Sequence, residues 1–508
     1  MSNTNEVHQK QLFGHPVGLY VLFMTELWER FSYYGMRAIL VFYLSAQTLG
    51  ENPGMGWTEK EALALYGWYT MLVYVASIPG GIIADRVLGQ KKSVMVGGAL
   101  LCIGHLALAF EADTAFFVGL GFIIAGVGML KPNISTMVGG LYEEGDERRD
   151  KGFSIFYMGI NLGAASASII VGIVANAYGW HVGFGLAGIG MLIGQAVYMY
   201  GQKYLPHVGN KVDLSQSNDQ VNLGELLQNL FKSPIKLAIT GALLAGSIYW
   251  TYSQSWQYGL LFIFLSLVVG MMMAFYQDLN TKVERDRYVV LLLAFLIVVV
   301  FWGAFEQAGG LMSLYTKSKT DRVVLGWTVP AEVMQSFNPI YIILFAVPVA
   351  GFWYKWKMKG RESSSIFKMA VGVIVMGLGF TFMVAASKQY EALGESALYW
   401  LALAYLLHTL GELCASPVAM SFITKLAPAK YASLMMGVYF ASTGLGNKVA
   451  GILGESATEF GELTIFTGIT IFCVVFGLLV IALLKPLKRL THGAEDLQPE
   501  SETEEAYA

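Results

Sequence analysis

The feature that most constrains this chain is a succession of about fourteen apolar segments, each long enough for a helix to cross a bilayer, which takes about 20 residues. Their approximate cores are 16–48, 61–84, 91–110, 115–140, 153–178, 181–203, 235–254, 258–277, 288–316, 337–354, 366–387, 396–425, 431–453 and 463–484. Only 14% of the residues are charged, whereas a soluble domain carries about a quarter. A segment inside lipid must satisfy its own backbone hydrogen bonds, and the alternation of a membrane barrel is missing, so we predict an all-α polytopic membrane protein.

Basic residues in the short loops predict which ends of the segments face the cytoplasm. They gather in the loops around Arg86, Arg148 and Lys355, before the ninth segment and after the last. These loops all lie on one side if both termini are cytoplasmic, and we expect that orientation in the cell (inner) membrane. One loop, which carries Lys317 and Lys319, disagrees because it would face outward.

Polar stretches divide the chain into parts, and the longest internal one separates the first six segments from the rest. The predicted parts are a cytoplasmic N-terminal segment (1–15), an N-terminal six-helix bundle (16–205), a cytoplasmic linker (206–233), an inserted two-helix hairpin (234–280), a C-terminal six-helix bundle (281–490) and a disordered acidic tail (491–508). The inserted pair contains almost no ionisable residue, so we expect it to face lipid and to take no part in the chemistry.

Ionisable residues inside the segments follow a pattern once the inserted pair is set aside. They concentrate in the first, fourth, seventh and tenth of the remaining segments. Such a residue costs about 2.5–3.5 kcal/mol at the centre of a spanning helix, so it marks a functional site. The spacing predicts three-helix units repeated four times, with one helix of each unit lining a central cavity for the substrate.

The first segment carries the densest group of charges. Glu26, Arg30, Tyr33 and Arg37 fall within about 60° of one another on a helix, and Glu29 lies on the flank of that stripe. A carboxylate loses its charge on protonation, whereas an arginine stays charged. The two glutamates beside Arg30 therefore form a proton site in principle.

The charges of the two halves differ in sign. The N-terminal half brings Arg30, Arg37 and Lys131 to the predicted cavity, and the C-terminal half brings Glu306 and Glu412. Such a cavity would orient a zwitterion, with its carboxylate toward the first half and its ammonium toward the second. The alternatives are a lysine at a helix end for Lys131 and structural salt bridges for the two glutamates.

Amide and aromatic residues complete the candidate site. Asn161 and Asn338 can bond a peptide amide, because a carboxamide both donates and accepts. The aromatic candidates for side-chain pockets, each with core packing as the alternative, are Tyr33, Tyr34, Tyr69, Trp302 and Tyr439. The three cysteines fit no metal-ligand spacing, so we expect neither metal nor cofactor. The net charge of −3 gives no reason to expect a nucleic acid partner.

Several motifs match a known family. The sequence Glu-Leu-Trp-Glu-Arg-Phe-Ser-Tyr-Tyr-Gly at 26–35 resembles the first-span ExxERFxYYG signature of the proton-dependent oligopeptide transporters (POT/PTR) of the major facilitator superfamily. Residues 153–163 resemble their fifth-span signature, and Lys131-Pro132-Asn133 and 411–417 also fit. The likeness runs from about residue 17 to 485, and the inserted pair is similar to the bacterial branch.

The resemblance implies two six-helix bundles, alternating access, and uptake of di- and tripeptides with protons. It implies that proton coupling involves Glu26, Glu29, Arg30, Lys131 and Glu306. It implies that Arg37 and Glu306 form a gate pair that also touches substrate. The substrate site that it implies consists of Arg30, Tyr33, Tyr34, Arg37, Tyr69, Lys131, Asn161, Trp302, Glu306, Asn338, Glu412 and Tyr439.

Two departures from the family affect these expectations. Tyr439 stands where several members have tryptophan, which bears on side-chain preference. The second segment has no histidine, unlike animal relatives, so coupling should rest on carboxylates. The alternatives are transport of another small solute, such as nitrate or a drug, on the same fold, and a polytopic membrane enzyme. An enzyme would need a nucleophile–base pair or a metal cluster, and the sequence shows neither, so we expect a non-enzymatic protein of the bilayer. A monomer is the default for this architecture.

Overall fold

The computed structural model describes residues 10–143, 146, 148–210, 234–253, 256–428 and 431–494. Most of the predicted N-terminal segment, linker and acidic tail lies outside these ranges. Long helices account for nearly all of the described chain. Their bounds are α1 Val17–Ser45, α2 Glu59–Val75, α3 Ser77–Ile83, α4 Gln90–Leu108, α5 Asp113–Gly139, α6 Arg148–Tyr178, α7 Trp180–Gly201, α9 Pro234–Ser253, α10 Trp256–Asp278, α11 Lys282–Phe305, α12 Leu311–Lys319, α13 Phe337–Met358, α14 Ser365–Leu393, α15 Leu398–Leu426, α16 Ala432–Phe460, α17 Glu462–Ala482 and α18 Leu484–Leu490.

Short turns and strands join these helices. A π-helical turn at 84–88 follows α3, and 3-10 turns lie at 202–204, between α11 and α12 at 306–309, and before α13 at 331–336. The described residues contain six strands of two residues each, which form three small pairs: β1 Gln11–Leu12 with β2 His15–Pro16, β4 Val323–Val324 with β5 Trp327–Thr328, both antiparallel, and β3 Thr320–Asp321 with β6 Ser396–Ala397, parallel. These pairs lie at helix ends, so the core is helical throughout.

The number of membrane-crossing helices agrees with the hydropathy pattern. Among the described residues, eleven helical stretches are long and apolar enough to cross a membrane. Three more long helices, α1, α9 and α16, bring the count to the fourteen predicted segments. Two predicted segments contain breaks: the second consists of α2 and α3, and the ninth consists of α11, the turn at 306–309 and α12.

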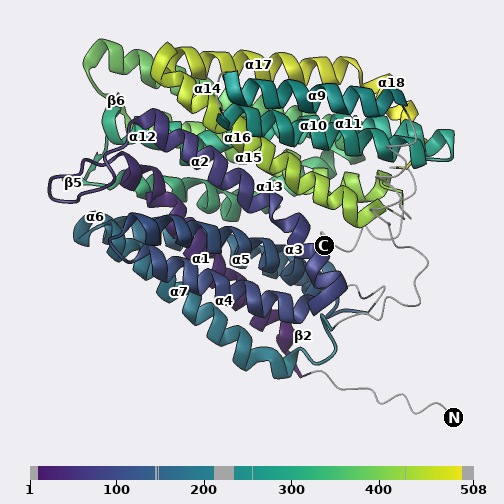
Figure 1. Ribbon diagram of the computed structural model, residues 1–508, viewed down its shortest axis with the longest axis horizontal. Coiled ribbons are helices and arrows are strands. Elements are labelled where there is room, and N and C mark those ends of the chain that lie inside the picture. Colours follow the sequence, from purple (N-terminus) through teal and green to yellow (C-terminus); the bar gives the residue numbers. More distant parts are fainter. Residues whose placement is uncertain are drawn as a thin grey trace.

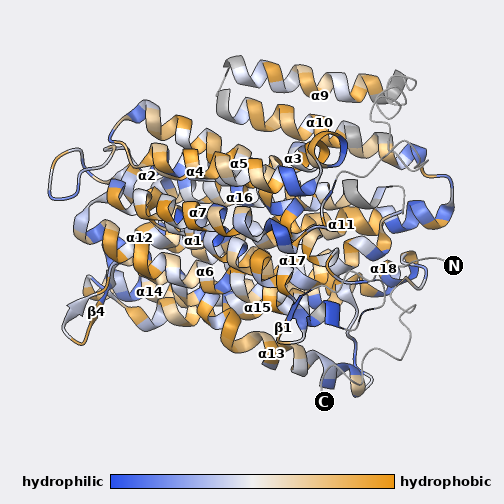
Figure 2. Cartoon of the chain, turned by 90° about the horizontal axis from the view of Figure 1, so that it is seen from below, coloured by the Kyte–Doolittle hydropathy of each residue, from blue (hydrophilic) through white to orange (hydrophobic). Residues whose placement is uncertain are grey.

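The helices form two bundles and an inserted pair. Buried apolar side chains make two separate cores, one drawn almost wholly from α1–α7 and the other from α10–α18. Helices α4–α7 lie together in the lower half of Figure 1, and α2 lies above them, against α16. Helices α9 and α10 pack against each other along one side of the molecule (Figure 2), where the hydroxyls of Ser247 and Ser266 lie 3.2 Å apart. The predicted architecture of two six-helix bundles with an inserted pair is confirmed.

The bundles touch where α2 meets α16 and where α6 meets α13 and its preceding turn. Glycine permits the first approach: a Cβ added at Gly67 would lie 2.9 Å from the Cα of Gly451. Strand β2 and helix α18 lie toward one end of the molecule, opposite β5 and β6 (Figure 1). At that opposite end, Lys319, one of the basic residues that conflicted with the predicted orientation, forms an ion pair of 2.6 Å with Glu462.

Candidate functional site

A cavity of about 1600 Å³ lies between the two bundles. Residues of α1, α2, α5 and α6 line it on one side, and residues of α11, α13, α15 and α16 line it on the other. Its walls extend to Arg86 and Gln90 after α3, and to Lys357 and Thr424 at the ends of α13 and α15. These residues lie toward the end of the molecule where β2 and α18 lie, so the cavity opens at that end.

Most of the predicted site residues line this cavity. Eleven of them do so: Glu26, Arg30, Tyr34, Arg37, Lys131, Asn161, Trp302, Glu306, Asn338, Glu412 and Tyr439. The other three, Glu29, Tyr33 and Tyr69, are 0%, 4% and 2% exposed and are not among the lining residues. Both tyrosines belong to the core of the N-terminal bundle, because successive helix positions turn by about 100° and carry them away from the cavity face. Direct contact of Tyr33 and Tyr69 with a ligand therefore finds no support in this conformation.

The glutamates of the first-segment motif share one arginine. The Nε of Arg30 lies 2.7 Å from Oε1 of Glu26, to which it donates a hydrogen bond, and 2.9 Å from Oε2 of Glu29. All three side chains are at most 5% exposed. Among the described residues, neither carboxylate oxygen of Glu29 has a hydrogen-bond partner. With both carboxylates ionised, the group carries one net negative charge in a place with little water, which is costly unless another cation is near.

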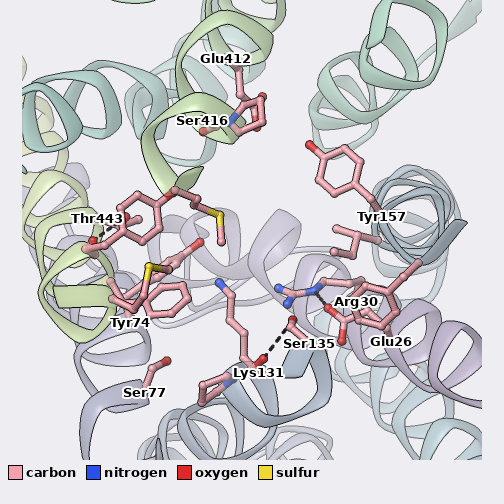
Figure 3. Close-up of a pocket in the computed structure, with 18 of the residues that line it drawn as sticks. Glu26, Arg30, Tyr74, Ser77, Lys131, Ser135, Tyr157, Glu412, Ser416 and Thr443 are labelled. Carbon is pink, nitrogen blue, oxygen red and sulfur yellow. Dashed lines mark hydrogen bonds and ion pairs between the residues drawn. The ribbon is translucent and has the colours of Figure 1, made fainter. Parts of the chain in front are cut away.

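That other cation is Lys131. Its ammonium lies 3.8 Å from the centre of the Tyr74 ring and 5.9 Å from that of Phe440, and the side chain points into the cavity (Figure 3). No carboxylate of the described residues lies within ion-pair distance of Lys131. Both first-segment glutamates are paired with Arg30 instead. A cation held against aromatic faces can bind an anionic group of a ligand.

The cavity is closed at its inner end by three side chains from three elements. Nη2 of Arg37 donates to Oε2 of Glu306 over 2.7 Å, and Nε of Arg37 donates to the Tyr66 hydroxyl over 2.8 Å. The Tyr66 hydroxyl in turn donates to the same oxygen of Glu306 over 2.8 Å. A Cβ added at Gly309 would lie 1.9 Å from that hydroxyl, so only glycine fits beside the lock. We call Arg37, Tyr66 and Glu306 the lock.

The opposite wall carries a carboxylate with a fixed position. Nδ2 of Asn338 on α13 donates to Oε2 of Glu412 on α15 over 2.8 Å, and it lies 3.1 Å from the Thr409 hydroxyl. Figure 3 shows Glu412 and Ser416 across the cavity from Arg30 and Glu26. Since Arg30 and Arg37 are paired with carboxylates, the charges that face the cavity without an ion partner among the described residues include Lys131 on one bundle and Glu412 on the other.

Some polar residues of the cavity and the bundle cores were missed in the sequence. Tyr66 and Tyr74 have the same apolar surroundings in the sequence as core aromatics, and no sequence signal separates them. Lys448 and Glu455 on α16 form a buried ion pair at 3.2 Å, so buried charge is not confined to every third segment. Lys448 lies inside the predicted segment 431–453 but was not singled out, and Glu455 lies beyond the end of that segment, whereas α16 continues to Phe460.

Comparisons with known proteins agree with this geometry. A model of the POT family matches residues 91–467. The chain is 37% identical to the uncharacterized transporter YclF of Bacillus subtilis (strain 168), over 96% of this chain and 97% of that one. It is 33% identical to the peptide transporter YePEPT of Yersinia enterocolitica (98% and 99%) and 34% identical to a di-/tripeptide transporter of Lactococcus lactis (96% and 99%).

Solved structures give the same result over nearly the full length. The chain is similar to a peptide transporter POT in complex with sulfate, with a TM-score of 0.80 and 35% identity, covering 95% of this chain and 97% of that one. It is also similar to a POT family transporter in complex with 5-aminolevulinic acid, with a TM-score of 0.80 and 32% identity, covering 94% and 98%. The predicted major facilitator superfamily fold is thereby confirmed, and the chain belongs to the POT family.

Proposed function

We propose that this protein is a proton-coupled symporter that takes up di- and tripeptides by alternating access. The observation that carries the proposal is the cavity between the bundles, with Lys131 on one wall, Glu412 on the other and a closed lock at its inner end. Relatives that align with almost the whole chain are named as peptide and di-/tripeptide transporters. The cavity of about 1600 Å³ is larger than an ordinary ligand pocket of about 300–1,000 Å³, so it has room for a tripeptide and an open approach to it.

The charges fit a zwitterion. The peptide carboxylate binds Lys131 and Arg30 on the N-terminal bundle, and the peptide ammonium binds Glu412 on the C-terminal bundle. Asn338 fixes the position of the Glu412 carboxylate. Asn161 donates to the carbonyl of Tyr157 on its own helix, so its side-chain oxygen is the atom left to accept from a peptide amide. Aromatic walls at Tyr34, Trp302 and Tyr439 contact the peptide side chains.

Coupling follows from the first-segment glutamates. While Glu26 and Glu29 are both ionised, Arg30 is fully compensated and Lys131 offsets the remaining negative charge in the same region. A proton on one glutamate leaves a net positive charge there, which attracts the peptide carboxylate. By linkage, bound peptide then raises the affinity of the site for the proton by the same factor. Proton and peptide therefore each strengthen the binding of the other, and this joint binding is the requirement for symport.

Alternating access follows from the lock. In this structure the lock is formed and the cavity is open at the other end, so the opposite state has the lock broken and that end closed. We propose that both termini face the cytoplasm, that the protein is a monomer in the cell (inner) membrane, and that the open end is the cytoplasmic one. The bundles proposed to move are 16–205 and 281–490, with the pair at 234–280 between them in sequence.

Purified protein in liposomes tests the proposal. We expect a pH gradient to drive accumulation of labelled dialanine in the parent. Glu29→Gln should lose this accumulation and keep exchange of labelled for unlabelled dialanine, because the peptide site is intact and only the proton site is gone. Glu51→Gln, on an exposed loop, is the matched control. Equal gradient-driven accumulation by Glu29→Gln and the parent would rule out the coupling assignment. Transport of nitrate without dialanine would favour the alternative solute.

A further inference from the structure

A buried ion pair on α16 takes no part in the cavity described above. Lys448 is 1% exposed and Glu455 is 6% exposed, and Nζ of the lysine lies 3.2 Å from Oε1 of the glutamate. Neither residue lines the cavity. They are seven residues apart and so lie on one face of the helix, two turns from each other. Charges inside a spanning helix cost free energy and are usually functional, so we expect this pair to have a function.

The lysine lies where the two bundles touch. A Cβ added at Gly67 of α2 would lie 3.4 Å from Cδ of Lys448 and 2.9 Å from the Cα of Gly451, so the backbones of α2 and α16 meet beside the lysine stem. The ammonium lies 5.0 Å from the centre of the Trp68 ring, which is also on α2. Lys448 is therefore anchored in one bundle by Glu455 and bound to the other bundle through an aromatic face.

Unpartnered polar groups lie on the same two helices. Asn447 is 0% exposed, and neither of its side-chain amide atoms has a hydrogen-bond partner among the described residues. The indole nitrogen of Trp68 is likewise without a partner in the described part of the chain. Buried groups of this kind cost free energy that water would return if the contact opened. The contact between α2 and α16 is thus stabilised by Lys448 over Trp68 and destabilised by its polar neighbours, as expected of an interface that must separate.

Other polar groups lie near Glu455 at the same end of the helices. Lys60 at the start of α2 forms an ion pair with Glu459 on α16, and both side chains are about half exposed. Tyr258 on α10 of the inserted pair lies within electrostatic range of Glu455 and Lys60. Three elements therefore meet here: a helix of each bundle and one helix of the insert.

We propose that Lys448 and Glu455 are positioning residues that set the balance between the lock-closed and lock-open states. Lys448 contacts Trp68 only while α2 and α16 touch, and Glu455 holds the ammonium when they separate. The lysine therefore keeps a partner in both states, and the helices can part without leaving a lone charge on α16. This role rests on the alternating access proposed above and adds a second, non-substrate contact to it.

A cysteine reporter on α2 tests this role. Leu63 is 1% exposed and lies against α16 and the turn after α11. A Cβ added at Gly454 of α16 would lie 3.3 Å from the Leu63 side chain, and a Cβ added at Gly310 would lie 3.1 Å from it. We replace the buried Cys102, Cys414 and Cys473 by alanine, introduce Leu63→Cys, and measure labelling by a membrane-impermeant maleimide. Labelling requires α2 to leave α16, and it requires neither peptide nor a proton gradient.

We expect Lys448→Met to raise the labelling rate about fivefold or more, because the contact with Trp68 is lost and Glu455 loses its cation when buried. Lys448→Arg should stay within about twofold of the parent, since it keeps both contacts. Lys448→Met combined with Glu455→Gln should label more slowly than Lys448→Met alone. The ratio of the half-saturating concentrations of dialanine and its C-terminal amide should not change in any of these variants, because a population shift scales both alike.

The opposite results would overturn the inference. They are a labelling rate of Lys448→Met within twofold of the parent, or a changed ratio of the two half-saturating concentrations without a change in labelling. If Lys448→Met is not recovered from membranes, the labelling rate of Leu63→Cys is measured in Trp68→Leu instead. Faster labelling in Trp68→Leu supports the inference, and unchanged labelling overturns it. If Lys448→Met alters labelling but the parent protein transports no dialanine, the proposed function alone is refuted. Normal uptake with unaltered labelling would refute this inference alone.

Discussion

Removing one oxygen atom from the lock should shift the conformational balance of the protein. Tyr66→Phe deletes a hydroxyl that accepts from Arg37 and donates to Glu306, both over 2.8 Å. All three residues are at most 7% exposed, so water does not replace the lost bonds while the lock is closed. The direct bond of 2.7 Å between Arg37 and Glu306 remains. The lock is therefore weakened but not broken.

The size of the shift follows from the bonds lost. A hydrogen bond to a charged group contributes about 1.5–3 kcal/mol to the state that contains it. In the open state water can satisfy Arg37 and Glu306, so the closed state alone is affected. Because relaxation of the remaining pair recovers part of the loss, we take about 2 kcal/mol as the net value. At 1.4 kcal/mol for each factor of ten, the open state gains roughly 30-fold in relative population.

The cysteine reporter at position 63 measures this population directly. Labelling of Leu63→Cys should be much faster with Tyr66→Phe than without it, up to the limit set by full opening. Tyr249→Phe, at a tyrosine that is 74% exposed on α9, is the matched control and should leave labelling unchanged. An unchanged rate in Tyr66→Phe, with normal amounts of protein in the membrane, would show that the Tyr66 hydroxyl does not hold the inner end of the cavity closed.

Two further variants separate the ends of the peptide. Glu412→Gln keeps the bond partner of Asn338 but removes the charge, so dialanine should compete at least tenfold less well while an N-acetylated dipeptide changes little. Competition against a labelled peptide measures both, and equal losses for the two peptides would contradict the role of Glu412. Lys131→Met should strongly weaken competition by dialanine and only slightly weaken competition by the C-terminal amide of dialanine. A loss of similar size for both would place Lys131 away from the peptide carboxylate.

Hydropathy was enough to predict the architecture. The fourteen segments, the inserted pair and the two bundles follow from where apolar runs begin and end, because lipid permits few alternatives to a helix. The charged stripe of α1 was also readable, since a helix fixes the angles between Glu26, Arg30 and Arg37. Breaks inside segments were less readable: Glu306 sits on a 3-10 turn after α11, although its surroundings in sequence are apolar.

Contacts between distant segments could not be read in the same way. Tyr66 takes part in the lock because α1, α2 and the turn after α11 converge, and Glu306 is 240 residues away from it. Nothing local distinguishes Tyr66 from Tyr69, its neighbour one turn on, whose hydroxyl has no partner in the described chain. The sequence favoured Tyr69 for the substrate site, yet the structure turns it into the bundle core. Side-chain direction depends on helix rotation within the bundle, which hydropathy leaves undetermined to within several tens of degrees.

Some charges of the cavity have an ion partner and others do not, and this difference accounts for the order of events in transport. At the lock, each charge already has an opposite charge within hydrogen-bond distance, so that end is stable when closed without any ligand. Lys131 and Glu412 lie on different bundles and have no ion partner among the described residues. A zwitterionic peptide between them supplies the missing charge to each bundle and so draws the two walls together at the open end. An empty cavity lacks that attraction, and closing it would bury two separated charges. Substrate is therefore required to close the open end, whereas the lock needs none, and this asymmetry is what prevents an empty, proton-loaded carrier from cycling freely.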